Sequence, residues 1–421
     1  MNPRLSSSLQ ATTSHPTPII GLAAIARIGF AGADLQPLWR SLVKRATADV
    51  SDAGALLDLS IIELIVGRRD NRFAFQAQAL TSQRLYRLVP AVETEKPLRL
   101  LAFMTAGDFM ANTPIEFLLE ESSVQLDILY VAPGQPLPDF IPEHDAAFIA
   151  IAESEENRDL LEEMRSIAEA WPVPVVNAAQ HIARLTRDGD YELLRDAPGL
   201  VMPVNLHLRR VQLCEIAGGD VKLDAILPGC AFPIIARPVG SHGGEGLQKL
   251  GSPDEIKTYL EARAEDKFYV APFVDYRSGD GLYRKYRVAL INGRAYGCHL
   301  AISRHWMVHY LNADMQDSAV NRAEESRFLA QFETDFGVRH AVALAAIVVH
   351  TELDYAVIDC AETADGRLLI FEIGTAMIVH SMDSPEIFPY KKAAMAKIFS
   401  AFTEMLRGKA AAASKTKARS A

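Results

Sequence analysis

The stretch of this sequence with the clearest chemical potential is a glycine-rich loop that follows an apolar, strand-like run. Residues 232–246 read Phe-Pro-Ile-Ile-Ala-Arg-Pro-Val-Gly-Ser-His-Gly-Gly-Glu-Gly. Glycine leaves backbone N–H groups uncovered, so such a loop can hold phosphate oxygens, and Arg237 adds positive charge at its base. The stretch is neither a P-loop nor a dinucleotide fingerprint, because it lacks Gly-Lys-Ser/Thr and Gly-x-Gly-x-x-Gly. A plain glycine-rich hairpin between two strands remains the alternative.

Two acidic residues occupy corresponding ends of a second hairpin. Residues 353–360 and 367–373 form apolar runs on either side of a turn that contains Asp365-Gly366, which is typical of paired strands. The carboxylates of Asp359 and Glu372 could therefore converge on one hard cation, and Mg²⁺ bridging nucleotide phosphates is the cation that this pattern favours.

Together these motifs resemble the ATP-grasp superfamily, which includes glutathione synthetase, D-alanine–D-alanine ligase and the ribosomal-protein glutamate ligases. The resemblance covers roughly residues 97–407 and rests on the glycine loop, a hinge-like strand at 268–275 and the acidic hairpin. It implies an α/β fold in which an ATP-grasp domain follows a parallel-sheet α/β domain and a small helical N-terminal module. It also implies ATP and Mg²⁺ as cofactors.

The resemblance also implies roles for individual residues. The implied nucleotide-binding residues are Arg237, Gly240, Ser241, His242, Gly243, Gly244, Gly246, Pro272, Phe273 and Asp275. Asp359 and Glu372 are the implied metal ligands. Arg287 corresponds to an arginine directed at the transferring phosphoryl group, and His380 lies in the loop that returns toward the acceptor pocket. Strand alternation places Lys285 on the same face as Arg287, and Arg284 on the other face.

Two positions depart from the family pattern. Arg237 stands where lysine is usual, which keeps the charge but replaces a flexible point charge with a planar fork. Gly374 stands where asparagine usually supplies a third metal ligand. Water, a backbone carbonyl, Thr375 or His380 would have to replace that oxygen, so the second departure affects turnover more than nucleotide binding.

The function expected from the resemblance is an ATP-dependent ligase that joins a carboxylate to an amine or thiol through an acyl phosphate. Small-molecule or peptide carboxylates and amines are the expected partners. Two alternatives stay open: an ATP-grasp kinase, and a nucleotide-binding regulatory or scaffold protein with little turnover.

Composition excludes several other classes. The chain has 421 residues, 49% of them hydrophobic, and a formal net charge of -10, which is typical of a globular protein and argues against a surface that coats nucleic acid. The four cysteines form no Cys-x-x-Cys pair, so we expect neither a zinc site nor a disulfide framework, and a cytoplasmic location. The apolar run at 341–349 is too short to span a membrane, and Arg27 interrupts the first apolar run, so no signal peptide is expected.

The pattern along the chain predicts five segments. These are a disordered tail at 1–20, a helical module at 21–93, an α/β domain at 94–200, the ATP-grasp domain at 201–407 and a disordered tail at 408–421. Residues 98–104 read as a buried strand, and Thr113-Pro-Ile-Glu116 as a capping box at the start of a helix. Asp108 and Asn112 are candidates for substrate contacts, with turn formation as the alternative. A homodimer, and a protein partner for residues 21–93, are left open.

Overall fold

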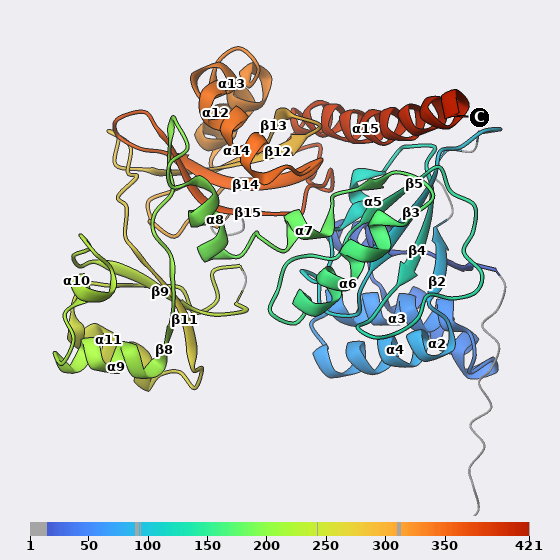
Figure 1. Cartoon of the computed structure of the whole chain (residues 1–421), viewed down its shortest axis with the longest axis horizontal. Coiled ribbons are helices and arrows are strands. Elements are labelled where there is room, and N and C mark those ends of the chain that lie inside the picture. The colour runs from blue at the N-terminus through green and yellow to red at the C-terminus, as the bar shows by residue number, and fades with distance from the viewer. Residues whose placement is uncertain (1–14, 89–91, 93, 242, 310–312, 421) are drawn as a thin grey trace, which may run out of the picture. The chain divides into compact units, whose positions relative to one another are not determined.

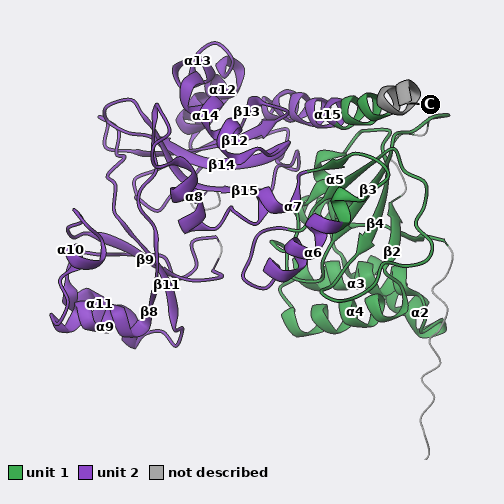
Figure 2. Cartoon of the chain, in the orientation of Figure 1, with its two compact units in different colours: residues 1–151, 167–176, 406–421 green, residues 152–166, 177–405 purple. Residues whose placement is uncertain are grey.

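The computed structural model describes residues 15–420 except 89–91, 93, 242 and 310–312, with side chains described up to residue 413 (Figure 1). The chain divides into two compact units (Figure 2). The first unit contains residues 1–151, 167–176 and 406–421, and the second contains residues 152–166 and 177–405.

A six-stranded sheet forms the centre of the first unit, in the order β1-β2-β4-β3-β5-β6. Its strands are β1 (Thr17–Ile19), β2 (Leu85–Leu88), β3 (Arg99–Met104), β4 (Gln125–Tyr130), β5 (Ala146–Ile149) and β6 (Val175–Val176). The strands from β3 to β6 are parallel, as the alternating pattern predicts, and β3 is buried almost throughout. Strand β2 pairs antiparallel with β4, so the sheet is mixed and not wholly parallel as expected.

Four helices lie between β1 and β2 in the chain. They are α1 (Leu22–Phe30), α2 (Gln36–Ala48), α3 (Ala53–Ile65) and α4 (Arg69–Ser82), and α2, α3 and α4 lie side by side in Figure 1. Ile25, Leu42 and Leu59 contribute to one shared apolar core among these helices. Strands β1 and β2 flank the helices and belong to the six-stranded sheet, so the helical segment and the sheet form one unit.

The capping box expected at residues 113–116 does not form. Helix α5 (Ile115–Leu118) has Pro114 at its N-cap and no side-chain capping bond. Glu116 instead accepts a hydrogen bond from the amide of Ala23 at 2.9 Å, at the start of α1. The prediction was wrong because a distant helix start, which the local pattern cannot show, takes this carboxylate.

The second unit contains an antiparallel four-stranded sheet in the order β10-β9-β11-β8. Its strands are β8 (Leu206–Arg209), β9 (Ile234–Pro238), β10 (Gln248–Leu250) and β11 (Lys267–Pro272), and the helices that accompany it are α9 (Arg210–Gly218), α10 (Leu223–Ile226) and α11 (Pro253–Glu261). Ile234, Ile256 and Phe268 are fully buried in the core between these helices and strands. Ser252 caps α11 ahead of a proline at its first position.

A five-stranded sheet completes the second unit, in the order β13-β12-β14-β15-β7. Its strands are β7 (Leu200–Val201), β12 (Tyr283–Ile291), β13 (Arg294–Ser303), β14 (Tyr355–Glu362) and β15 (Leu368–Gly374). The helices of this part are α6 (Arg158–Glu169), which runs across the boundary between the units, α7 (Ala179–Ile182), α8 (Arg187–Leu194), α12 (Ala319–Gln331), α13 (Phe336–Arg339) and α14 (Ala341–Thr351). Strands β14 and β15 form the predicted hairpin. The fold is thus mixed α/β with three sheets and N-terminal helices, as expected.

The last helix, α15 (Lys391–Ser420), extends through the segment expected to be disordered from residue 408. The segment is rich in alanine and lysine, which both have high helix propensity, and this composition accounts for the continuation.

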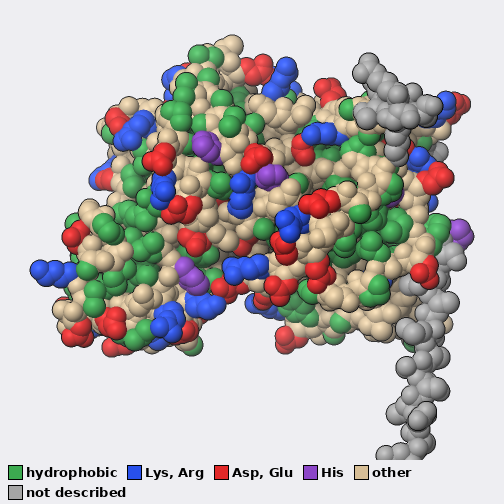
Figure 3. Space-filling view, viewed as in Figure 1, with side chains coloured by type: hydrophobic (Ala, Val, Ile, Leu, Met, Phe, Trp, Pro, Cys, Tyr) green, Lys and Arg blue, Asp and Glu red, His purple; other side chains and the backbone are tan. Residues whose placement is uncertain are grey.

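None of the helices in the described part of the chain combines the length and apolar character of a membrane span. Basic and acidic side chains are interspersed on the face seen in Figure 3.

Candidate functional site

A row of polar and charged residues crosses the five-stranded sheet. His299 on β13 pairs with Arg287 on β12, Arg287 pairs with Asp359 on β14, and Asp359 pairs with Glu372 on β15. Directly opposed residues of antiparallel strands point to the same face, so these four side chains share one face of the sheet. The sequence predicted the Asp359–Glu372 pair; the strand order adds Arg287 beside it.

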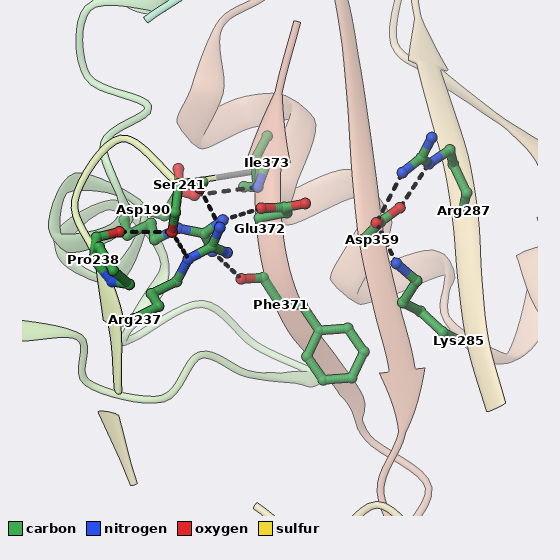
Figure 4. Close-up of polar contacts among 11 residues, drawn as sticks. Asp190, Arg237, Pro238, Ser241, Lys285, Arg287, Asp359, Phe371, Glu372 and Ile373 are labelled. Atoms are coloured by element: carbon green, nitrogen blue, oxygen red, sulfur yellow. Dashed lines mark hydrogen bonds and ion pairs between the residues drawn. The ribbon is translucent and has the colours of Figure 1, made fainter. Parts of the chain in front are cut away.

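The Asp359 carboxylate is buried between two cations (Figure 4). Arg287 Nε donates to Oδ1 at 2.7 Å and Arg287 Nη2 to Oδ2 at 2.9 Å, while Lys285 Nζ donates to Oδ2 at 2.9 Å. Burial alone would raise the pKa of Asp359, but the charges of Arg287 and Lys285 outweigh it and hold the pKa well below its usual range. Both basic residues face this carboxylate, as strand alternation predicted.

Arg284 lies on the opposite face of β12 from Lys285 and Arg287, as strand alternation also predicted. It pairs with Asp280 and Glu324 and makes no contact with the Asp359 carboxylate. The basic cluster on β12 therefore divides between the two faces of the strand.

The loop after β15 is tied to this row by Arg287. Arg287 Nη1 donates to the carbonyl of Ile378 at 3.0 Å. His380 follows two residues later, and its Nδ1 accepts a hydrogen bond from the amide of Met382 at 3.1 Å. A neutral ring in this arrangement carries its hydrogen on Nε2. Arg287 thus links the row to the loop that carries His380.

The Glu372 carboxylate is held from a different part of the chain. Arg187, at the first position of α8, donates from Nη2 to Glu372 Oε2 and from Nη1 to the carbonyl of Phe371 at 3.4 Å. Burial would raise the pKa of Glu372, but the charge of Arg187 outweighs it and the pKa is lowered. The pairing of β14 and β15 shifts register beside Asp359, and such a bulge changes the direction of neighbouring side chains.

Helix α8 provides a hydrogen-bond acceptor to the part of β15 that does not pair with β7. Strand β7 pairs only with Leu368 and Leu369. Beyond it, Asp190 Oδ2 accepts the amide hydrogen of Ile373 at 3.2 Å, one turn along α8 from Arg187. Burial raises the pKa of Asp190 well above its usual value, which favours the neutral form. Its Oδ1 has no hydrogen-bond partner among the described residues.

The glycine loop adopts a conformation that requires glycine. Gly240, Gly243, Gly244 and Gly246 all have left-handed φ angles, between 61° and 82°. A Cβ atom on Gly246 would lie 2.6 Å from Pro238 Cδ. None of the described residues accepts a hydrogen bond from the amides of Gly240, Gly243 or Gly244, which leaves these donors for a ligand. His242 lies outside the described residues.

Arg237 supports the base of this loop. Its Nε donates to Ser241 Oγ at 3.1 Å and its Nη2 to the Ser241 carbonyl, while Ser241 Oγ donates to the carbonyl of Pro238 at 2.7 Å (Figure 4). Burial, and to a lesser degree the charge of Arg187, lowers the pKa of Arg237 to about 10, so it remains charged near neutral pH. The charges of Arg187 and Glu372 act on Arg237 in opposite directions: that of Arg187 lowers its pKa and that of Glu372 raises it.

The hinge residues lie at and beyond the end of β11. The amide of Phe273, which follows Pro272, donates to the carbonyl of Pro233 at 3.1 Å. Lys249 Nζ is 3.6 Å from the centre of the Phe273 ring, and Trp306 meets the same ring edge-on at 5.5 Å. Asp275 is engaged by Arg277 at 2.8 Å. The structure thus builds a basic and aromatic surface at Phe273, whereas Asp275 holds its own loop.

The charges at this site suit a polyphosphate. Arg187, Lys285 and Arg287 bind the two carboxylates of Asp359 and Glu372, and the charge of Arg237 also acts on Glu372. These six groups carry two positive charges in excess. An anion with several charges would complete this balance.

The residues present also fit a magnesium ion that arrives with phosphate. Mg²⁺ in nucleotide sites is held by one or two carboxylates together with phosphate oxygens. Asp359 and Glu372 are ionised and share a face, although the described residues include no group of three or more His, Cys, Asp or Glu side chains that could hold a metal alone. The buried Thr375 Oγ1, next to Gly374, has no hydrogen-bond partner among them.

Sequence reasoning missed Arg187, Asp190 and Lys249. One signal was available for Arg187, because a cation at the first position of a helix is unfavourable unless an anion holds it. Asp108 and Asn112 act within their own loop: Asp108 accepts the amide hydrogen of Met110 at 2.9 Å, and Asn112 bonds both backbone groups of Thr105 at 2.8 Å. These contacts favour the turn-forming alternative.

Comparison with solved structures finds known proteins that are similar to this chain. No protein-family model and no curated protein sequence matches it. A D-alanine–D-alanine ligase from Bacillus anthracis complexed with ATP is 15% identical, with a TM-score of 0.44, and the match covers 76% of this chain and 99% of that one. VanG D-Ala:D-Ser ligase from Enterococcus faecalis is 11% identical, with a TM-score of 0.45 and coverage of 74% and 100%. An ATP-grasp RimK domain protein from Sphaerobacter thermophilus is 14% identical, with a TM-score of 0.41 and coverage of 72% and 98%. The solved structures similar to this chain thus include ligases of the family whose motifs this sequence resembles.

Proposed function

We propose that this protein binds ATP with Mg²⁺ and uses it to join a carboxylate to an amine or a thiol. The observation that carries the proposal is the cross-strand row of Arg287, Asp359 and Glu372, with Lys285 and Arg187 bound to its carboxylates. This arrangement gathers cations at the place where a triphosphate would bring its negative charge.

Each part of the site has a role in this proposal. The backbone amides of Gly240, Gly243 and Gly244 and the charge of Arg237 hold the β- and γ-phosphates. Arg287 stabilises the transferring phosphoryl group, and its bonds to Asp359 and to the Ile378 carbonyl fix its orientation before substrate arrives. Phe273, with Lys249 and Trp306 beside it, offers a surface for the base. His380 contacts the acceptor.

The proposed chemistry has two steps. A carboxylate oxygen of the substrate attacks the γ-phosphorus, and the bond to the leaving ADP oxygen breaks, which gives an acyl phosphate. The amine or thiol then attacks the acyl carbon, inorganic phosphate leaves, and the nucleophile loses its proton. Mg²⁺ held by Glu372 and Asp359 would neutralise charge on the phosphates. Arg287 and Lys285 supply positive charge from the protein throughout.

One alternative has a specific observation in its favour. Gly374 offers no side-chain oxygen, and cations already hold both carboxylates. A protein that binds nucleotide for regulation, with little turnover, would tolerate both features. An ATP-grasp kinase that stops after the first step is distinguished by a stable phosphorylated product.

Phosphate release from ATP, measured over a panel of carboxylates with and without amines or thiols, tests the proposal. The ligase predicts release that requires both substrates, together with positional isotope exchange in ATP when the carboxylate alone is present. Tight ATP binding without exchange or release for any pair would favour the regulatory alternative. Absence of ATP binding would contradict the proposal.

A further inference from the structure

Arg187 binds Oε2 of Glu372, one of the two oxygens that this carboxylate could offer to a metal ion. Its Nη2 binds Glu372 Oε2, and Mg²⁺ binds its oxygen ligands at about 2.1 Å, so a metal on this oxygen would lie in contact with the guanidinium. Two positive charges at that separation repel each other strongly. We propose that Arg187 competes with the metal for Glu372 and so makes metal binding depend on the arrival of nucleotide. This inference rests on the proposed function.

The two carboxylates of the row differ in how firmly they are held. Asp359 is 2% exposed and receives three hydrogen bonds from two cations. The side chain of Glu372 is 31% exposed and that of Arg187 is 20% exposed, and a single Arg187 nitrogen reaches the carboxylate. The other Arg187 contact, to the Phe371 carbonyl, is long at 3.4 Å. Of the ion pairs at this site, Arg187–Glu372 is thus the most exposed and should cost the least to break.

Helix α8 has anchors that do not depend on Arg187. Asp190 accepts the amide hydrogen of Ile373, and the hydroxyl of Thr186 caps the helix by accepting from the amide of Gly189 at 2.9 Å. The helix should therefore stay in place when the Arg187 side chain moves or is removed. The Arg187–Glu372 contact can thus be lost while α8 remains bound to β15 through Asp190.

A phosphate would give Arg187 a second partner close to the first. The charge of Arg187 contributes to lowering the pKa of Arg237, as expected for two like charges that lie near each other. A phosphate between the glycine loop and β15 would relieve this repulsion by binding both groups, and arginine forks suit phosphate oxygens. Glu372 would then be free for the metal. The order of binding follows: nucleotide moves Arg187, and the metal enters with the nucleotide and not before it.

Manganese without nucleotide is a direct probe of this competition. The test compares wild type, Arg187→Gln and the control Arg195→Gln, with Mn²⁺ binding measured by electron paramagnetic resonance. Arg195 lies at the end of the same helix, is half exposed and pairs with Glu192 and Asp196 near it in sequence. Loss of a charge-assisted contact corresponds to about tenfold in affinity, so Arg187→Gln should bind Mn²⁺ about tenfold more tightly than the other two.

A second readout uses ATP in the presence of a chelator. Without metal, Arg187→Gln should bind ATP about tenfold more weakly than wild type, because one phosphate contact is lost. Arg187→Lys keeps the charge and should leave Mn²⁺ affinity low. If Arg187→Lys gains Mn²⁺ affinity as Arg187→Gln does, or if Arg187→Gln gains none, the competition is refuted.

The outcomes separate this inference from the proposed function. Failure of every variant to bind Mn²⁺, with ATP binding intact, overturns the role of Arg187 and leaves the nucleotide site standing. Failure of wild type to bind ATP overturns the proposed function, whereas a gain in Mn²⁺ affinity in Arg187→Gln would still support competition at Glu372.

Discussion

Asp359 and Glu372 are direct partners across β14 and β15, but cations from different parts of the chain hold their carboxylates. Arg287 and Lys285, both on the neighbouring strand β12, bind Asp359, while Arg187 reaches Glu372 from a helix that lies about 180 residues earlier. Asp359 is thus the more firmly held of the two carboxylates, and Glu372 is the carboxylate whose partner can change. This difference separates the predictions about stability from those about ligand binding.

Removal of Arg287 should destabilise the second unit. Arg287→Met leaves the buried Asp359 with Lys285 alone, and breaking a buried ion pair costs about 3 kcal/mol or more. The control is Arg284→Met, on the opposite face of β12. The acidic partners of Arg284 are more exposed, so this substitution should lower the free energy of unfolding by about 1 kcal/mol or less. Hydrogen exchange of the β12 and β14 amides in denaturant measures both changes. Equal effects of the two substitutions would mean that Asp359 does not depend on Arg287.

Arg237 should matter for phosphate and not for the nucleoside. Arg237→Ala should weaken ATP binding by one to two powers of ten, from the roughly 1.5–3 kcal/mol of a charge-assisted contact, and leave adenosine binding nearly unchanged. Because Arg237 also holds Ser241, Ser241→Ala is the control for loop support, and it should have the smaller effect on ATP. Calorimetric titrations that show equal losses for ATP and adenosine would remove Arg237 from the phosphate site.

Asparagine at position 374 should strengthen metal binding. Gly374 does not have a left-handed φ angle, and a Cβ atom there would make ordinary contact with Met377 Cε at 3.6 Å. The side chain would share the face of Glu372 two residues earlier on β15. We expect Gly374→Asn to bind Mg²⁺ about tenfold more tightly in the presence of ATP, a gain typical of one added ligand contact to a charge. A folded variant with unchanged metal affinity would indicate that another group, with Thr375 and His380 next to test, completes the site.

The stability of the first unit should fall as pH rises. Burial raises the pKa of Glu116 to about 7 and that of Asp58 to about 6, against ordinary values of 4.5 and 3.8. The folded state holds these protons more tightly than the unfolded state, so their stabilising contribution is complete below about pH 4 and is lost as pH rises through 7. Each group contributes a slope of at most about 1.4 kcal/mol per pH unit.

Tryptophan fluorescence in denaturant can follow this unit alone. Trp39 and Trp171 belong to it, so a Trp306→Phe background removes the signal of the second unit. Glu116→Gln, which can still accept the hydrogen bond from Ala23, should flatten the decline of the free energy of unfolding between pH 5 and 8. A slope that Glu116→Gln does not change would rule out Glu116 as its source.

The parts of the site that sequence could predict are those built from neighbours along the chain. The Asp359–Glu372 hairpin has a tight turn and two apolar strands, and the positive φ angles of the loop require the glycines that mark it. The shared face of Lys285 and Arg287 follows from strand alternation alone. Arg187 escaped prediction because its partner lies 185 residues away, and no local pattern specifies such a contact. Strand β1 escaped because three residues are too few to show a period.

The central claim is that Glu372 and the cations around it form a site for ATP with its metal. Calorimetric titration of ATP into the full chain, in Mg²⁺ and then in chelator, tests it most directly when wild type is compared with Glu372→Gln. We predict that wild type binds ATP about tenfold or more tightly in Mg²⁺ than in chelator, and that Glu372→Gln binds ATP equally in both. Absence of ATP binding to wild type, or the same dependence on Mg²⁺ in both proteins, would contradict the claim.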